Sequence, residues 1–156
     1  MSEKDSIAGY LDYSSWWIGH GSDLHKKNTE ELRSLVSKFK NEGLSSEDAF
    51  KKALNQVGQL SHPNQECCWE IEDKIKKKDA VSWEVLKSII EQAPHDEKLL
   101  NFIGAGPFED WISEENFNSY KEELQTFLKT NQKWKIVVKA SWHNPNELEM
   151  LLDRQK

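Results

Sequence analysis

Residues 99–112 constrain the fold more than any other part of the chain, because their pattern ends one helix and begins another within a few positions. The apolar residues at the start of this segment suit the last buried turns of a helix. Gly104 or Gly106 can take the left-handed conformation that closes a helix. Pro107 suits the first position of the next helix, where no N–H is needed. We therefore expect a structural corner between two buried helices, formed by Gly104, Gly106 and Pro107.

Apolar residues recur at helical spacing along the rest of the chain, whereas alternating β-branched runs are nearly absent. The stripe over residues 32–39 is one example of this helical spacing. The run Ile136–Val138 would suit a strand, but the chain offers no partner run, so we expect a helix over 133–142. The sequence predicts one all-α domain over residues 1–156, a compact array of short antiparallel helix pairs with about eight or nine helices.

Capping residues predict where several of these helices begin and end. The segment 19–23, Gly-His-Gly-Ser-Asp, is expected to break the first helix, and Asn28 is expected to cap the next one. Gly43 is expected to end that second helix by the glycine route. Later helices are expected to begin at Asp79, Asp96 and Ser113.

The formal net charge is −6, which opposes general binding of nucleic acid or of anionic membrane surfaces, because both require a basic protein surface. No apolar run approaches the roughly 20 residues of a membrane span. The start of the chain, Met1–Asp5, lacks the layout of a signal peptide. Cys67 and Cys68 are adjacent, and two reduced thiols are the better interpretation because a disulfide between neighbours is strained. We therefore expect a cytoplasmic protein that uses no cofactor.

The segment Gly104–Asp110, Gly-Ala-Gly-Pro-Phe-Glu-Asp, resembles the corner of a bacterial all-helical domain family of unknown function. Short members of that family carry Gly-Ala-Gly-Pro, then Leu or Phe, then Glu-Asp or Glu-Asn. The likeness covers residues 69–142 and includes Trp83–Leu86 and Ala93–Asp96 ahead of the corner. This resemblance implies an all-helical bacterial domain and no particular activity. Immunity proteins that neutralise toxins are an analogy for small acidic helical proteins of this kind.

Two groups of residues suggest catalytic chemistry, and each has a plainer explanation. The segment His20–His25 holds three metal-binding side chains within six residues, a spacing that chelates zinc or nickel weakly. No further ligand is identifiable, so solvated histidines in a loop are the favoured interpretation and no metal is expected. Cys67 and Cys68 lie between acidic neighbours, which raise a thiol pKa, so packing thiols are favoured over a nucleophile.

Acidic residues are concentrated between residues 96 and 123, which contain eight acidic and two basic side chains. The net charge of this stretch, −6, equals that of the whole chain. Four of these acids, Glu109, Asp110, Glu114 and Glu115, are expected in the first turns of helices, where the helix dipole favours negative charge. A solvated face is the commoner explanation for such a stretch, and a docking surface for a basic partner is the functional one.

Aromatic residues supply the remaining candidates for a binding surface. Trp16 and Trp17 are adjacent, so on a helix they lie about 100° apart and cannot both point inward. An exposed tryptophan at this position, or Trp111 among the acids, would be typical of an interface hot spot.

The sequence therefore predicts a non-catalytic cytoplasmic domain that binds a protein partner. In its sharpest form this hypothesis is an immunity-type inhibitor, whose acidic and aromatic face, Glu109, Asp110, Trp111, Glu114 and Glu115 with Trp16 and Trp17, neutralises a toxin. The alternatives are a metal-dependent or other hydrolase that uses the loop His20–His25, and a homodimeric adaptor.

Overall fold

A computed structural model describes residues 2–58, 61–142 and 144–153 of the chain, and its regular structure is entirely helical within those ranges. The all-α prediction is confirmed. Contacts divide the chain into two compact units, one formed by 1–15 with 64–156 and the other by Trp16–Pro63. A single domain over 1–156 stays a prediction. None of the helices in the described ranges has the length and apolarity to cross a membrane.

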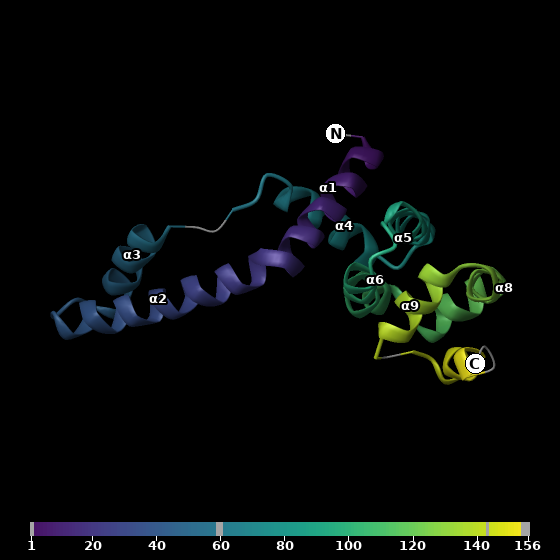
Figure 1. The fold of residues 1–156 in the computed structure, drawn as a ribbon. Coiled ribbons are helices and arrows are strands. Elements are labelled where there is room, and N and C mark those ends of the chain that lie inside the picture. The colour runs from purple at the N-terminus through teal and green to yellow at the C-terminus, as the bar shows by residue number, and fades with distance from the viewer. Residues whose placement is uncertain (1, 59–60, 143, 154–156) are drawn as a thin grey trace. The chain divides into compact units, whose positions relative to one another are not determined.

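The unit Trp16–Pro63, here called the hairpin unit, consists of η1 (Trp17–Gly21), α2 (Ser22–Asn41) and α3 (Ser46–Val57). Figure 1 shows α3 lying along α2. Phe39 is buried in a small core against Ala49 and Ala53 of α3. Helix α2 ends as predicted: Gly43 has φ 99°, its N–H donates to Lys40, and the next N–H donates to the carbonyl of Phe39. This pair of bonds is a Schellman motif, which satisfies the last carbonyls of α2.

The predicted break at residues 19–23 is wrong. The backbone keeps right-handed helical angles at Trp16, Gly21 and Ser22, and residues 17–21 form a π-helical turn. Gly21 serves packing rather than helix breaking, because a Cβ there would lie 2.6 Å from the Trp16 ring. Asn28 consequently lies inside α2 and does not cap a helix.

The other unit, here called the main unit, holds the remaining helices. These are α1 (Glu3–Trp16), α4 (Gln65–Lys76), α5 (Ala80–Gln92), α6 (Glu97–Ile103), η2 (Gly104–Phe108), α7 (Glu109–Trp111), α8 (Glu114–Thr130), α9 (Gln132–Ala140) and α10 (Asn146–Asp153). The last residue of α1 falls beyond the unit boundary. Three predicted N-caps are confirmed, because the side chains of Asp79, Asp96 and Ser113 each accept an N–H bond from three residues ahead.

Stacked aromatic rings fill the centre of the main unit. Trp83 of α5 stacks on Trp111 at 4.7 Å and on Tyr120 at 4.9 Å between ring centroids. Trp134 of α9 stacks on Phe127 at 4.7 Å and also contacts Trp83. Large aromatic rings bury much area each, so a few of them bind α5, α7, α8 and α9 into one core.

The Gly-Pro segment is not the corner that its sequence predicts. Gly104 has φ −67° and ψ −46°, and neither Gly104 nor Gly106 lies in the left-handed region. The helical backbone runs on from α6 through η2 into α7, with Pro107 inside a π-helical turn. A widened turn of this kind accommodates a residue without an N–H, as π-bulges do within helices. The real corner lies at Ile112 and Ser113, where the backbone becomes extended.

Gly104 is nevertheless essential to packing. A Cβ built on Gly104 would lie 2.2 Å from the carbonyl oxygen of Val137 and 2.7 Å from the Cβ of Ala140. The helix therefore needs glycine there so that α9 can approach its backbone. A Cβ on Gly106 would meet no atom within 4 Å, so Gly106 has no comparable role.

Candidate functional site

The four predicted acids divide into two pairs on either side of the real corner. Glu114 and Glu115 lie exposed in the first turn of α8, where the dipole favours negative charge, as the sequence predicts. Glu109 and Asp110 do not lie at a helix start, because α7 is the last turn of the helix that begins at α6. At that end the dipole disfavours carboxylates, so helix capping does not explain this second pair.

Trp142 stands next to this second pair and is the most exposed large apolar residue in the part of the chain that the structure describes, with 86% of its surface accessible. Its backbone N–H donates to Oε2 of Glu109 at 2.8 Å. This bond joins the first residue of α7 to the residue that follows the C-cap of α9, so the carboxylate of Glu109 has a partner within the fold. The exposed carboxylate of Asp110 makes no hydrogen bond or ion pair with the other described residues.

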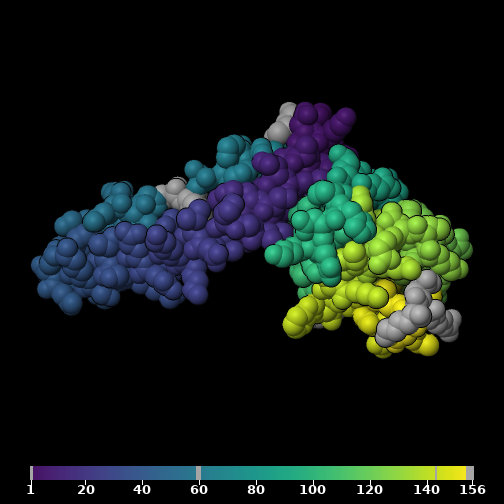
Figure 2. Space-filling model, viewed as in Figure 1, coloured from purple at the N-terminus to yellow at the C-terminus, as the bar shows by residue number. Residues whose placement is uncertain are grey.

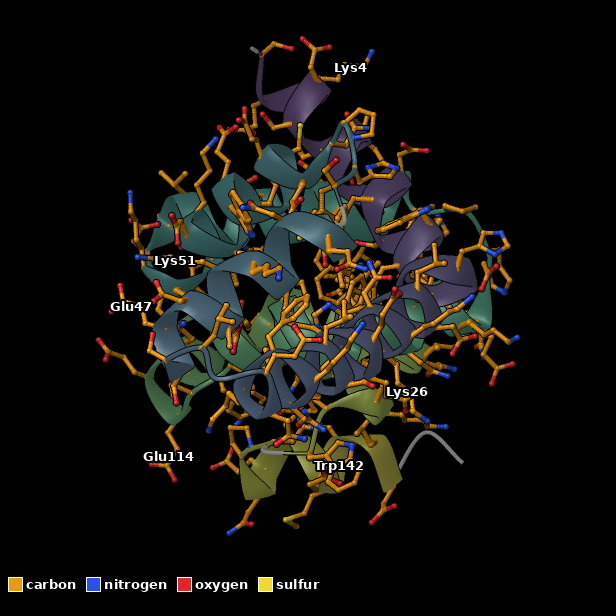
Figure 3. All side chains as sticks on the ribbon, turned by 90° about the vertical axis from the view of Figure 1, so that its left-hand side faces the viewer. Lys4, Lys26, Glu47, Lys51, Glu114 and Trp142 are labelled. Atoms are coloured by element: carbon orange, nitrogen blue, oxygen red, sulfur yellow. The ribbon has the colours of Figure 1, made fainter. Side chains whose placement is uncertain are left out.

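Hydrogen bonds hold the described residues on either side of Trp142. The side-chain amide of Asn144 donates to the carbonyl of Val138 at 2.9 Å and to Glu149 Oε1 at 2.9 Å, which ties the turn to both α9 and α10. In Figure 3 Glu114 points outward and Trp142 lies over the ribbon of the C-terminal helices. The backbone of Trp142 is thus held while its ring remains in solvent, which is the condition for a low-entropy binding anchor.

The expectation that Trp111 anchors a partner is wrong. Trp111 is fully buried and stacks on Trp83, so it belongs to the core. Its neighbour Asp110 is exposed, since consecutive helix positions differ by about 100° and only one of the two faces inward.

Trp16 and Trp17 belong to the hairpin unit, and both are half-buried. The Trp16 ring lies 4.8 Å from the His62 ring, and the Trp17 ring lies 5.7 Å from the His25 ring. Their contact with a partner remains a prediction.

The candidate catalytic groups do not form a site. His20 and His25 lie on helices rather than in a loop, and across the described residues no group of three metal-binding side chains comes together. Cys67 and Cys68 are buried and unbridged. Burial, followed by the carboxylate of Glu72 at 3.5 Å from the Cys68 sulfur, raises the pKa of Cys68 to about 12. A thiol in that state is a packing group rather than a nucleophile.

Comparison of the chain with models of known families, with curated proteins and with solved structures gives no match. The bacterial family with the Gly-Ala-Gly-Pro segment remains a prediction. Functional inference therefore depends on the chemistry of the main unit itself.

Trp142 is not among the predicted site residues, because its position falls within the helix expected over 133–142. Helix α9 ends at Ala140, and the backbone at Ser141 is extended. The available signal was the turn sequence that follows Trp142, Asn144-Pro145, which begins the next helix two residues later. A tryptophan next to such a turn is outside the preceding helix, so the apolar stripe of that helix does not predict its burial.

Proposed function

We propose that this protein is a non-catalytic binding domain whose partner is a basic protein. The binding face would consist of Trp142 and the carboxylates of Glu109, Asp110, Glu114 and Glu115. Trp142 carries the proposal, because its side chain is exposed while its backbone is hydrogen-bonded, and tryptophan is among the residue types that most often dominate the binding energy of an interface.

The charge distribution supports a basic partner. The main unit contains 21 acidic and 14 basic residues, whereas the hairpin unit contains six acidic and seven basic ones. The excess negative charge of the chain thus belongs to the unit that carries Trp142. Acidic residues of this unit would steer a basic partner during encounter, and those at the contact would form the polar rim of the interface.

A capture experiment with matched variants tests this proposal. Extract of the source cells is passed over immobilised wild-type protein, Trp142→Ala and Trp69→Ala. Trp69 of α4 is the control, because it is also an exposed tryptophan of the main unit, with 57% of its surface accessible. We expect a basic protein that wild type and Trp69→Ala retain, that high salt releases and that Trp142→Ala loses.

Two results would contradict the proposal. One is a partner that all three baits retain equally. The other is a partner whose retention does not depend on salt, since dissolved ions screen the attraction between an acidic face and a basic partner.

An immunity-type inhibitor is the sharpest form of this proposal. It predicts that the captured partner arrests growth when it is expressed alone, and that co-expression of wild-type protein restores growth. Trp142→Ala should fail to restore growth while Trp69→Ala restores it. A harmless partner would rule out neutralisation but would leave protein binding in place.

A further inference from the structure

A groove between α8 and α10 opens into two neighbouring hollows of about 280 Å³ and 370 Å³. The first hollow is lined by Glu114, Phe117, Asn118, Pro145, Asn146 and Glu147. The second is lined by Lys121, Gln125, Glu147, Met150 and Leu151. Figure 2 shows the yellow surface of the C-terminal residues against the green surface of α8. Because Glu147 lines both hollows, they are neighbours along α8 and α10.

The first hollow is rich in hydrogen-bond acceptors. Two carboxylates, Glu114 and Glu147, reach it from different helices, and the amides of Asn118 and Asn146 stand beside them. Glu147 is paired with Lys121, whereas Glu114 makes no hydrogen bond or ion pair with other described residues. The space therefore suits a cationic side chain, which would gain a charge-assisted bond from the Glu114 carboxylate.

The second hollow is suited to an apolar side chain. Met150 is 57% exposed at its wall, and Leu151 is half-buried beside it. Lys121 Nζ lies 2.5 Å from Glu147 Oε2, so the ion pair separates the acidic hollow from the apolar one. An adaptable methionine at the rim is typical of surfaces that receive apolar side chains.

The spacing of the hollows limits the shape of the occupant. The residues of α8 that line them are centred about seven positions apart, which corresponds to about 10 Å along a helix. A polyproline II segment covers about the same distance in three residues, at about 3.1 Å each, and its side chains at i and i+3 point the same way because it has three residues per turn. The two hollows therefore match side chains at positions i and i+3 of a segment in that conformation.

We infer that the groove between α8 and α10 binds a polyproline II segment of the basic partner, with an Arg or Lys in the first hollow and a large apolar side chain three positions away in the second. This inference rests on the proposed function and deepens it, because it states which side chains of the partner this face selects. Glu114 lines the groove and is also part of the proposed acidic face.

Titration of the isotope-labelled full chain with short capped peptides tests the groove directly by NMR. The probes are Arg-Ala-Ala-Leu and Leu-Ala-Ala-Arg, and the matched control peptides carry Glu in place of Arg. We expect amide shifts over 114–125 and 146–151 with the Arg peptides and none with the Glu peptides. Glu114→Gln should weaken binding about fivefold by removing one charge-assisted contact. Glu122→Gln, an exposed residue of α8 outside both hollows, should leave binding unchanged.

Three outcomes would overturn the inference that the groove binds this segment. They are no amide shifts at millimolar peptide, equal binding of the Glu peptides, and shifts confined to residues outside the two hollows. Shifts at the groove that depend on protein concentration without peptide would mean that a second copy fills it, and would also overturn the inference. The proposed function fails separately, by the loss of any Trp142-dependent capture. A failed peptide titration with a positive capture would therefore reject the groove alone.

Discussion

Replacing Gly104 by alanine should destabilise the main unit, although alanine normally favours a helix. The new Cβ would lie 2.2 Å from the carbonyl oxygen of Val137, about 1 Å closer than van der Waals contact allows. Neither atom belongs to a flexible side chain, so α9 itself has to move away from η2. Overpacking of this kind costs about 1–3 kcal/mol, and the higher helix propensity of alanine returns about 1 kcal/mol at most.

We therefore expect Gly104→Ala to lower the free energy of unfolding by about 1–2 kcal/mol, which corresponds to about 2–8 °C in Tm for a chain of this size. Thermal and urea unfolding, followed by circular dichroism, measure both quantities. Gly104→Val should cost more, because a branched side chain adds further clashes.

Gly106→Ala is the matched control for this prediction. Gly106 has a right-handed backbone, and a Cβ there would meet no atom within 4 Å. Alanine should thus leave the stability unchanged or raise it by up to about 1 kcal/mol, through a less flexible unfolded chain. A Gly104→Ala variant with the Tm of wild type, or an equal loss of stability in both variants, would refute the role of Gly104 in packing.

Three further predictions concern the core, the buried thiol and acid stability. Trp111→Ala should cost about 3–5 kcal/mol in urea unfolding, because it empties the centre of the aromatic core, whereas Trp142→Ala should change stability by less than about 0.5 kcal/mol. Cys68 should resist alkylation at pH 7 to 8 and react only on unfolding, because its raised pKa keeps the thiol protonated; rapid labelling of the native protein would contradict this. The N–H of Ser82 and then its hydroxyl lower the pKa of Asp79 below its ordinary value of 3.8, so the stabilisation is present above that value and is lost as the pH falls through the lowered one. Asp79→Asn keeps an acceptor but does not titrate, so its unfolding free energy should fall less steeply with acid, and an unchanged slope would reject this role.

Local chemistry made much of the fold predictable. The caps at Asp79, Asp96 and Ser113 and the glycine end at Gly43 depend on bonds within four or five residues, so the sequence contains all that determines them. The all-α class follows from the same short-range patterns.

The role of Gly104 could not be predicted, because it depends on α9, which approaches from more than thirty residues away. A Gly-Ala-Gly-Pro segment is locally compatible with a helix end, and only tertiary packing selects the continuous π-helical path. The same limit applies to Gly21, which gives room to the Trp16 ring and does not break the helix.

Side-chain exposure was also beyond the sequence. Trp111 and Trp142 are both tryptophans near helix ends, yet one is fully buried and the other is the most exposed large apolar side chain of the described ranges. The acids at 114 and 115 were placed correctly at a helix start. Glu109 and Asp110 do not lie at a helix start, because the helix continues through Gly104–Phe108, where the sequence predicted a corner.

The association rate with the captured partner, measured against ionic strength, tests the acidic binding face most directly. The variants are Glu114→Lys/Glu115→Lys and, as a control of equal charge change, Glu30→Lys/Glu31→Lys on the exposed surface of α2. We predict that the first variant associates about tenfold more slowly at low salt with a shallower salt dependence, while the control stays within about twofold of wild type. Equal behaviour of the two variants, or a rate that neither the substitutions nor salt changes, would contradict a basic partner bound at this face.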